Sequence, residues 1–121
     1  MTTSQSAARA YAAGARHRPM RDQEAEVFRY AAAGLQRAAD AGALPRTRAL
    51  ADNARLWTAV MDLLRDPDNR LPESLRAGII SLGLAVEREM AQPEPDFAFL
   101  IGINHNVAAG LTGTAGTGDA R

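Results

Sequence analysis

The chain has 121 residues, no cysteine, and 14 acidic residues that balance 14 basic ones. This length fits one domain with its own hydrophobic core. The absence of cysteine excludes disulfides, thiol nucleophiles and cysteine-based zinc sites, and the balanced charge argues against binding nucleic acid mainly through charge. No apolar run approaches the roughly 18 residues of a membrane span and the start lacks a signal-peptide core, so we expect a soluble cytoplasmic protein.

The N-terminal segment is basic. Within residues 1–21 there are four arginines and no acidic residue: Arg9, Arg16, Arg18 and Arg21. Residues 3–15 are rich in alanine and predict a short helix, which is marginal in water unless Tyr11 docks on the body. We expect a solvated arm or short helix here, with contact to RNA or an acidic partner as the alternative.

Two long helices follow this arm. Pro19 is expected to interrupt the helical pattern of the arm. Asp22 is then a suitable N-cap for the first long helix, and Gly42 ends this helix as a C′ residue with positive φ. The next helix opens at Leu44-Pro45, because proline is tolerated in a first turn, and stops at residues 66–69. This acidic turn lacks the glycine and the ligand spacing of a calcium loop, so we assign it no metal.

Two further helices complete the predicted body. Pro72 lies in the first turn of one, whose apolar stripe from Leu75 to Met90 is wide enough for contact on two sides. Asp96 caps the other, which has an apolar face from Phe97 to Leu111. No β-alternation persists, so the sequence predicts an all-α fold, a small bundle of four main helices plus a short N-terminal helix or arm. The predicted divisions are the arm (1–21), the bundle (22–111) and a disordered tail (112–121).

Two asparagines lie in the middle of apolar helical stripes. Asn53 shares its stripe with Trp57, the only tryptophan, around which neighbouring helices are expected to pack, and Asn104 has a matching position in the last helix. A buried amide costs stability unless it is hydrogen-bonded, so each one either bonds a neighbouring helix end or loop in the core or lines a groove. Our candidate partner-binding residues are Asn53, Trp57, Leu82 and Asn104, with core packing as the alternative for Trp57 and Leu82.

The sequence offers no recognisable catalytic site. His17 and His105 are too few for a histidine-built metal site, and the absence of lysine excludes a P-loop of the usual form. Glu87 and Glu89 are two residues apart and point to different faces of a helix, so they cannot act as a paired acid and base. We expect a protein that is not an enzyme and uses no cofactor or metal.

A series of short motifs extends along nearly the whole chain. They are Ala10-Tyr11, residues 21–26, Ala49-Leu50-x-x-Asn53-x-x-Leu56-Trp57, the block from Leu71-Pro72 to Ile79-Ile80-Ser81-Leu82, and Ile101-x-Ile103-Asn104 with Gly110-Leu111-x-Gly113. The block around Trp57 and the block from Leu71 to Leu82 are the specific ones. In this order the motifs resemble the FlaF family of flagellar biosynthesis regulators.

The resemblance implies a role in flagellin supply. FlaF proteins are small cytoplasmic factors required for flagellin production and export, and they act with and against FlbT, which represses flagellin mRNA. They behave like a chaperone for flagellin, so the implied partners are flagellin and an FlbT-like regulator. A helical body can hold an amphipathic helix in a groove, here at the stripe 75–90 or the face 97–111, and flagellin subunits offer such helices at their ends.

Two alternatives stay open from the residues alone. One is an RNA-binding post-transcriptional regulator of flagellin mRNA, although the neutral charge and the lack of exposed aromatic platforms argue against direct contact with nucleic acid. Its candidate contacts, to RNA or to an acidic partner, are Arg9, Arg16, Arg18, Arg46 and Arg48. The other alternative is a helical interaction module unrelated to flagella.

Overall fold

The computed structural model describes the backbone of residues 17–120 and the side chains of residues 23–113. Its four helices are α2 (His17–Ala38), α3 (Ala43–Arg65), α4 (Glu73–Met90) and α5 (Phe97–Ala120). The described residues contain no strand, so the predicted all-α bundle of four main helices is confirmed. The short helix or arm predicted at the N-terminus falls mostly on residues 1–16, outside the described part.

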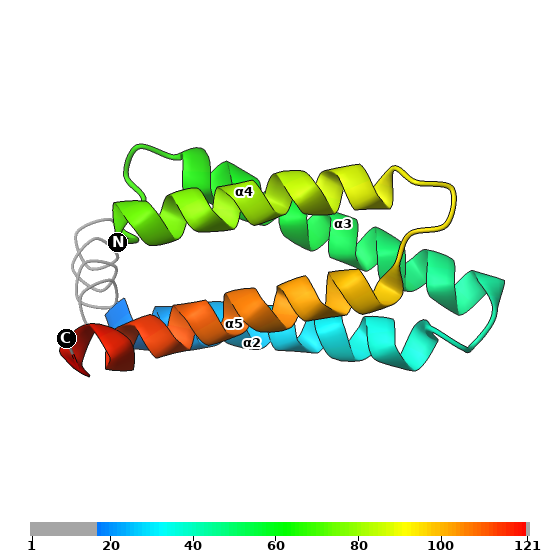
Figure 1. Cartoon of the computed structure of the whole chain (residues 1–121), viewed down its shortest axis with the longest axis horizontal. Helices are drawn as coiled ribbons and strands as arrows, with labels where there is room; N and C mark the ends of the chain where they lie inside the picture. Colours follow the sequence, from blue (N-terminus) through cyan, green and yellow to red (C-terminus); the bar gives the residue numbers. More distant parts are fainter. Residues whose placement is uncertain (1–16, 121) are drawn as a thin grey trace, which may run out of the picture.

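The helices form an antiparallel ring in which each packs against the next along the chain and α5 closes against α2. Figure 1 shows α4 and α5 on the near side and α3 and α2 behind them. Two pairs therefore lie across the diagonals, α2 with α4 and α3 with α5. Among the neighbouring pairs, α2 and α5 are packed most closely and α4 and α5 least closely.

Local signals explain most of the helix ends. Gly42 has the predicted positive φ, 104°, which glycine adopts without steric cost, but it is the N-cap of α3 and not the C′ residue of α2, which already ends at Ala38. The Asp96 carboxylate accepts a hydrogen bond from the Phe99 N–H at 3.1 Å, which confirms it as the N-cap of α5. Pro72 directly precedes α4, where its lack of an N–H costs nothing.

Two boundaries differ from the prediction. The first long helix begins at His17 rather than at an Asp22 cap, so Pro19 lies inside its first turn. Proline is tolerated there because the first four N–H groups of a helix have no intrahelical partner. At the other end, α5 continues to Ala120, beyond the apolar face that was predicted to reach Leu111. Beyond Leu111 the hydroxyl of Thr112 donates to the carbonyl of Ala108 at 3.1 Å, within the helix.

The core is organised around Trp57, which is buried and contacts all three other helices. Its ring meets Phe28 of α2 edge-on, with 5.4 Å between ring centroids and 64° between planes. Gly83 of α4 lies so close that a Cβ there would be 3.1 Å from Trp57 Cε3. The indole N–H donates to Asn104 of α5 at 2.9 Å. The expectation that neighbouring helices pack around this side chain is confirmed.

Candidate partner-binding surfaces

A chain of hydrogen bonds crosses the centre of the bundle along the α3–α5 diagonal. Trp57 Nε1 donates to Asn104 Oδ1 at 2.9 Å, and Asn104 Nδ2 donates to Asn53 Oδ1 at 2.9 Å. Asn53 Nδ2 completes the chain by donating to the Met90 sulfur at 3.4 Å. Thioether sulfur is a weak acceptor, but it gives the last amide a partner. Among the described side chains, no buried nitrogen or oxygen lacks a hydrogen-bond partner.

The structure places three of the candidate partner-binding residues in the core. Asn53 and Trp57 are 1% exposed and Asn104 is fully buried, so none of them lines a groove. The amides also do not bond a helix end or a loop, as the core alternative assumed, but bond each other and their neighbours. Their mid-stripe positions turn both side chains toward the same diagonal, where two amides and an indole satisfy one another.

Leu82, the fourth candidate, is partly buried and packs against the edge of the core. Its position follows from the antiparallel register of α4 and α5. At one end, Leu75 Cδ1 lies 3.7 Å from where a Cβ on Gly110 would stand, and at the other Glu89 Oε2 accepts from the Asp96 N–H at 2.8 Å. Leu82 and Ile103 each lie seven residues from both of these contacts, so the register puts them at the same level of the two helices.

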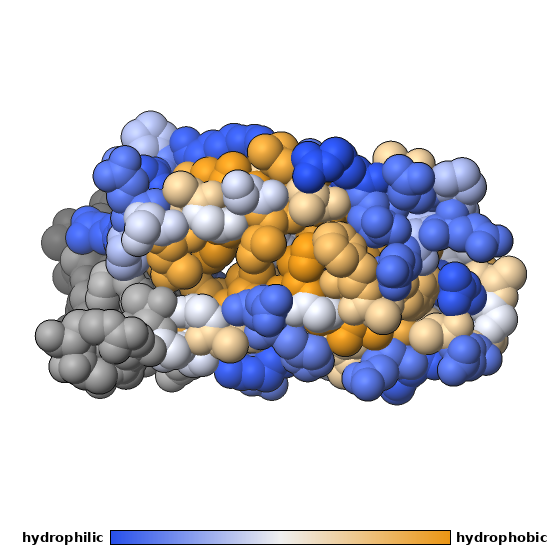
Figure 2. All heavy atoms as spheres, in the orientation of Figure 1, coloured by the Kyte–Doolittle hydropathy of each residue, from blue (hydrophilic) through white to orange (hydrophobic). Residues whose placement is uncertain are grey.

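The surface between these helices is apolar. Figure 2 shows hydrophobic side chains gathered in the depression between α4 and α5. Residues three, four or seven positions apart lie on the same side of a helix, and this spacing identifies the residues that line the surface between α4 and α5. We call this surface the α4–α5 groove and, from the helical spacing and the register of the two helices, assign to it Leu75, Gly78, Leu82 and Ala85 of α4 with Phe99 and the buried Ile103 of α5.

Two details keep the α4–α5 groove open. The Phe99 ring is 41% exposed, although a side chain of this size is usually well buried in a small domain. A Cβ built on Gly78 would meet nothing within 4 Å, so this side of α4 has free space. The groove thus combines an accessible aromatic ring with room for an incoming side chain.

The structure describes the side chains of two of the five candidate arginines. Arg46 donates to the Ala39 carbonyl at 2.6 Å and its guanidinium lies 4.2 Å above the Phe97 ring, so it joins the end of α2 to the starts of α3 and α5. The predicted contact with RNA or an acidic partner would compete with these two interactions for the Arg46 guanidinium. Arg48 is exposed. Arg9 and Arg16 lie outside the described residues, as does the side chain of Arg18.

A second groove, between α2 and α3, was missed in the sequence. It has a volume of about 590 Å³ and is lined by Val27, Tyr30, Ala31, Gly34, Leu35, Arg37, Ala38, Pro45, Arg48, Ala49, Asp52 and Leu56. We call it the α2–α3 groove. Tyr30 is 73% exposed beside it. The available signal was Val27 and Tyr30 on the outer face of the first helix, where apolar side chains have no core to fill.

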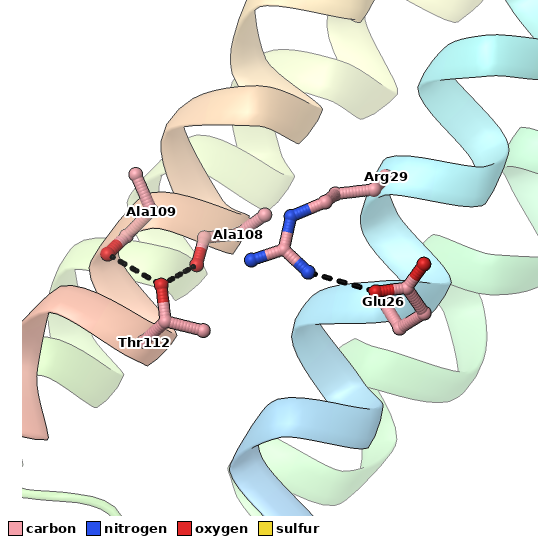
Figure 3. Close-up of polar contacts among 5 residues, drawn as sticks. All are labelled: Glu26, Arg29, Ala108, Ala109 and Thr112. Atoms are coloured by element: carbon pink, nitrogen blue, oxygen red, sulfur yellow. Dashed lines mark hydrogen bonds and ion pairs between the residues drawn. The ribbon is translucent and has the colours of Figure 1, made fainter.

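Two sets of local polar contacts lie on α2 and α5. Arg29 pairs with Glu26 one turn away at 2.9 Å, and the Thr112 hydroxyl bonds carbonyls of its own helix (Figure 3). The acidic turn after α3 is also locally satisfied, since the Asp66 carboxylate accepts from the Asp68 N–H at 2.9 Å. In the part of the chain that the structure describes, no three histidine or acidic side chains are grouped to hold a metal ion.

The whole-chain comparison decides the family. The model of the family "Flagellar protein FlaF" matches residues 7–111, which include every residue that lines either groove. The chain belongs to the FlaF family. Comparison with curated proteins and with solved structures gives no match. Membership in FlaF makes this a flagellar protein and sets aside the interaction module unrelated to flagella. No helix in the described residues of this FlaF member is long and apolar enough to cross a membrane.

Proposed function

We propose that this FlaF-family protein is a flagellin-specific factor of flagellum biogenesis, which binds flagellin as a secretion chaperone and promotes its synthesis and export. It works in the cytoplasm together with an FlbT-like repressor, and it acts by binding rather than by catalysis. The observation that carries the proposal is the exposed apolar α4–α5 groove on a member of a flagellar family.

The dimensions of the groove suit an amphipathic helix. From the level of Leu75 to the level of Glu89 the groove follows about 14 residues of α4, which corresponds to about 21 Å, or four helical turns. Apolar side chains that recur every three or four residues on a partner helix would contact Leu75, Leu82 and Phe99 in turn. The buried polar side chains of the described core already have hydrogen-bond partners, so a partner protein does not need to open the bundle.

Titration calorimetry with flagellin tests this function. The full chain is titrated with monomeric flagellin of the same organism and with flagellin that lacks its terminal helices. We expect micromolar or tighter binding that disappears with those helices. No heat and no co-elution would contradict direct chaperoning and would favour a regulator that acts through FlbT or the message.

A matched pair of variants tests the surface. Phe99 and Leu84 are both 41% exposed, but Leu84 lies on the outer face of α4, away from the groove. Phe99→Glu should weaken flagellin binding at least tenfold, about 1.4 kcal/mol or more, because it puts a charge where an apolar contact forms. Leu84→Glu should leave the affinity unchanged. Equal affinities for both variants would show that flagellin binds elsewhere.

The RNA-binding alternative has less support, because Arg46 is occupied by Ala39 and Phe97. Filter retention of flagellin mRNA at increasing salt concentration measures whether the protein binds RNA. A steep loss of retention with salt would favour this alternative, since binding through phosphates releases counterions.

A further inference from the structure

We propose that the α2–α3 groove is a second docking site, which takes an amphipathic helix with a carboxylate from a partner protein. This groove lies behind the α4–α5 groove, on the opposite side of the bundle (Figure 1). The two surfaces share no residue, so the proposal stands apart from flagellin binding.

One half of the α2–α3 groove is apolar and shallow enough for a helix. Val27 is 48% exposed and Tyr30 is 73% exposed, so both present accessible apolar surface. Between them and α3 the lining is small, with Ala31 and Ala49, which allows another backbone to approach closely. Exposed apolar side chains beside a floor of small residues are typical of a surface that receives a helix.

The other half is lined by two exposed arginines, Arg37 of α2 and Arg48 of α3. The hydrogen bond from Arg46 to the Ala39 carbonyl and the ring contact of Phe28 with Trp57 set the same antiparallel register for α2 and α3. In this register Arg37 lies opposite Arg48, and both line the groove. Arg37 Nη2 is 3.9 Å from where a Cβ on Gly34 would stand, so its guanidinium lies over the groove floor.

Neither guanidinium forms an ion pair with a described residue. The ion pairs among the described residues are Arg29 with Glu26 and Arg55 with Asp52, and neither includes Arg37 or Arg48. The acidic residue of this groove, Asp52, is thus already paired with Arg55. Two like charges at one level repel each other, and a carboxylate between them accepts charge-assisted hydrogen bonds from both. The charge of the site therefore selects an acidic group.

The spacing of the groove defines the partner helix. Tyr30 and Arg37 are seven residues apart on α2, which is two helical turns or about 10.5 Å. A partner helix matches this when an apolar side chain and a carboxylate are also separated by two turns, with small or apolar residues between them. We expect such a helix to place its apolar residue on Tyr30 and its carboxylate between the two arginines.

Three labelled peptides test the site. They are alanine-based helices of about 18 residues, long enough to be helical in water. All three have leucines on one face and differ at one position, seven residues beyond the first leucine. This position is Glu in the first peptide, Gln in the second and Arg in the third. Fluorescence anisotropy with the full chain at low salt should rank their affinities Glu over Gln over Arg, with at least about a tenfold difference between the first and the last.

Charge reversal provides the decisive comparison. The double variant Arg37→Glu with Arg48→Glu should invert the order of the three peptides. The control Arg65→Glu with Arg70→Glu has the same change of net charge on exposed arginines outside the groove and should keep the original order. Circular dichroism melting verifies that both double variants are folded. An order that survives reversal of Arg37 and Arg48 would overturn the proposal.

Two single variants show which of the two grooves the peptides occupy. Tyr30→Ser should weaken binding of all three peptides, whereas Phe99→Glu in the α4–α5 groove should change none of them, whatever its effect on flagellin. Absence of binding by every peptide, or equal binding of all three, would overturn the proposal. So would self-association of the chain that Tyr30→Ser abolishes, because the groove would then be a contact between copies.

Discussion

Asn104 connects α5 to α3 through both ends of its amide, since its oxygen accepts from Trp57 and its nitrogen donates to Asn53. A buried hydrogen bond of this kind adds only about 1 kcal/mol to stability, but a buried group left without its partner costs about 1–3 kcal/mol. These hydrogen bonds therefore specify how α3 and α5 align, because sliding either helix would leave polar atoms unpaired in the core.

The first prediction at this scale concerns Asn104. Asn104→Ala leaves the Trp57 N–H and the Asn53 oxygen unpaired in a dry core, so we expect the free energy of unfolding to fall by about 2–5 kcal/mol. Asn106→Ala removes the same side chain from an exposed position two residues away and should change stability by less than about 0.5 kcal/mol. Urea denaturation followed by tryptophan fluorescence measures both. Equal losses would mean that the hydrogen-bond chain does not stabilise the fold.

Two glycines on α4 allow a prediction of opposite sign. A Cβ on Gly83 would lie within 3.1 Å of Trp57 and would overlap the buried Met61 sulfur, so Gly83→Ala should destabilise the protein by about 1–3 kcal/mol. Gly78 has nothing within 4 Å, and Gly78→Ala should stabilise by about 0.5–1 kcal/mol through helix propensity alone. Thermal melts of the two variants compare them. A gain in stability for both would show that α4 moves away from α3 without cost.

At the scale of elements, the corner between α2 and α3 depends on Gly42 and Arg46. The positive φ of Gly42 reverses the chain, and Arg46 then reaches back to the Ala39 carbonyl, which α2 leaves without an intrahelical partner. The same guanidinium stacks on Phe97 at the start of α5. One side chain thus joins three helix ends, because arginine combines several donors with a flat face that stacks on aromatic rings.

The matching prediction compares two arginines of the same turn. Arg46→Ala removes the hydrogen bond and the stacking, so we expect a loss of about 1–3 kcal/mol in the free energy of unfolding. Arg48→Ala should be within about 0.5 kcal/mol of the parent, because Arg48 is exposed and makes no ion pair with a described residue. Guanidinium denaturation of both variants measures the difference. A neutral Arg46→Ala would show that Gly42 alone holds the corner.

At the scale of the whole molecule, the ring of four helices presents two grooves on opposite faces around one closed core. Apolar contact dominates the α4–α5 groove, whereas the α2–α3 groove adds two arginines to an apolar half. The faces differ because α4 and α5 are packed least closely and leave apolar side chains accessible, while small residues on α2 and α3 make a floor between larger ones. If both proposals hold, two partner helices of different character occupy separate faces of the bundle.

Simultaneous binding is the prediction at this scale. The glutamate peptide should bind the complex of the chain with flagellin with the same affinity as the free chain, since the two grooves share no residue. Anisotropy titrations with and without saturating flagellin measure this. Competition between peptide and flagellin would indicate either one shared surface or coupling through the core.

The helices themselves were readable from local signals. The apolar period of 3.6, the positive φ of Gly42, the Asp96 cap and the prolines each act within one or two turns, so they define elements without knowledge of the neighbours. The start of α2 was not readable in this way. Proline permits both a break and a first helical turn, and its position alone does not distinguish them. The family was also readable, because its motifs are continuous blocks of sequence.

The sequence by itself thus determined the helices, the fold class and the family of this protein. Only the tertiary structure decided the partners of Asn53 and Asn104, which are 51 residues apart. Both amides stand on apolar stripes, and a stripe indicates that a residue faces inward but not which residue it meets. The same holds for Gly83 under Trp57 and for both grooves, because close contact and open space between helices arise from the register of whole helices, which no local segment contains.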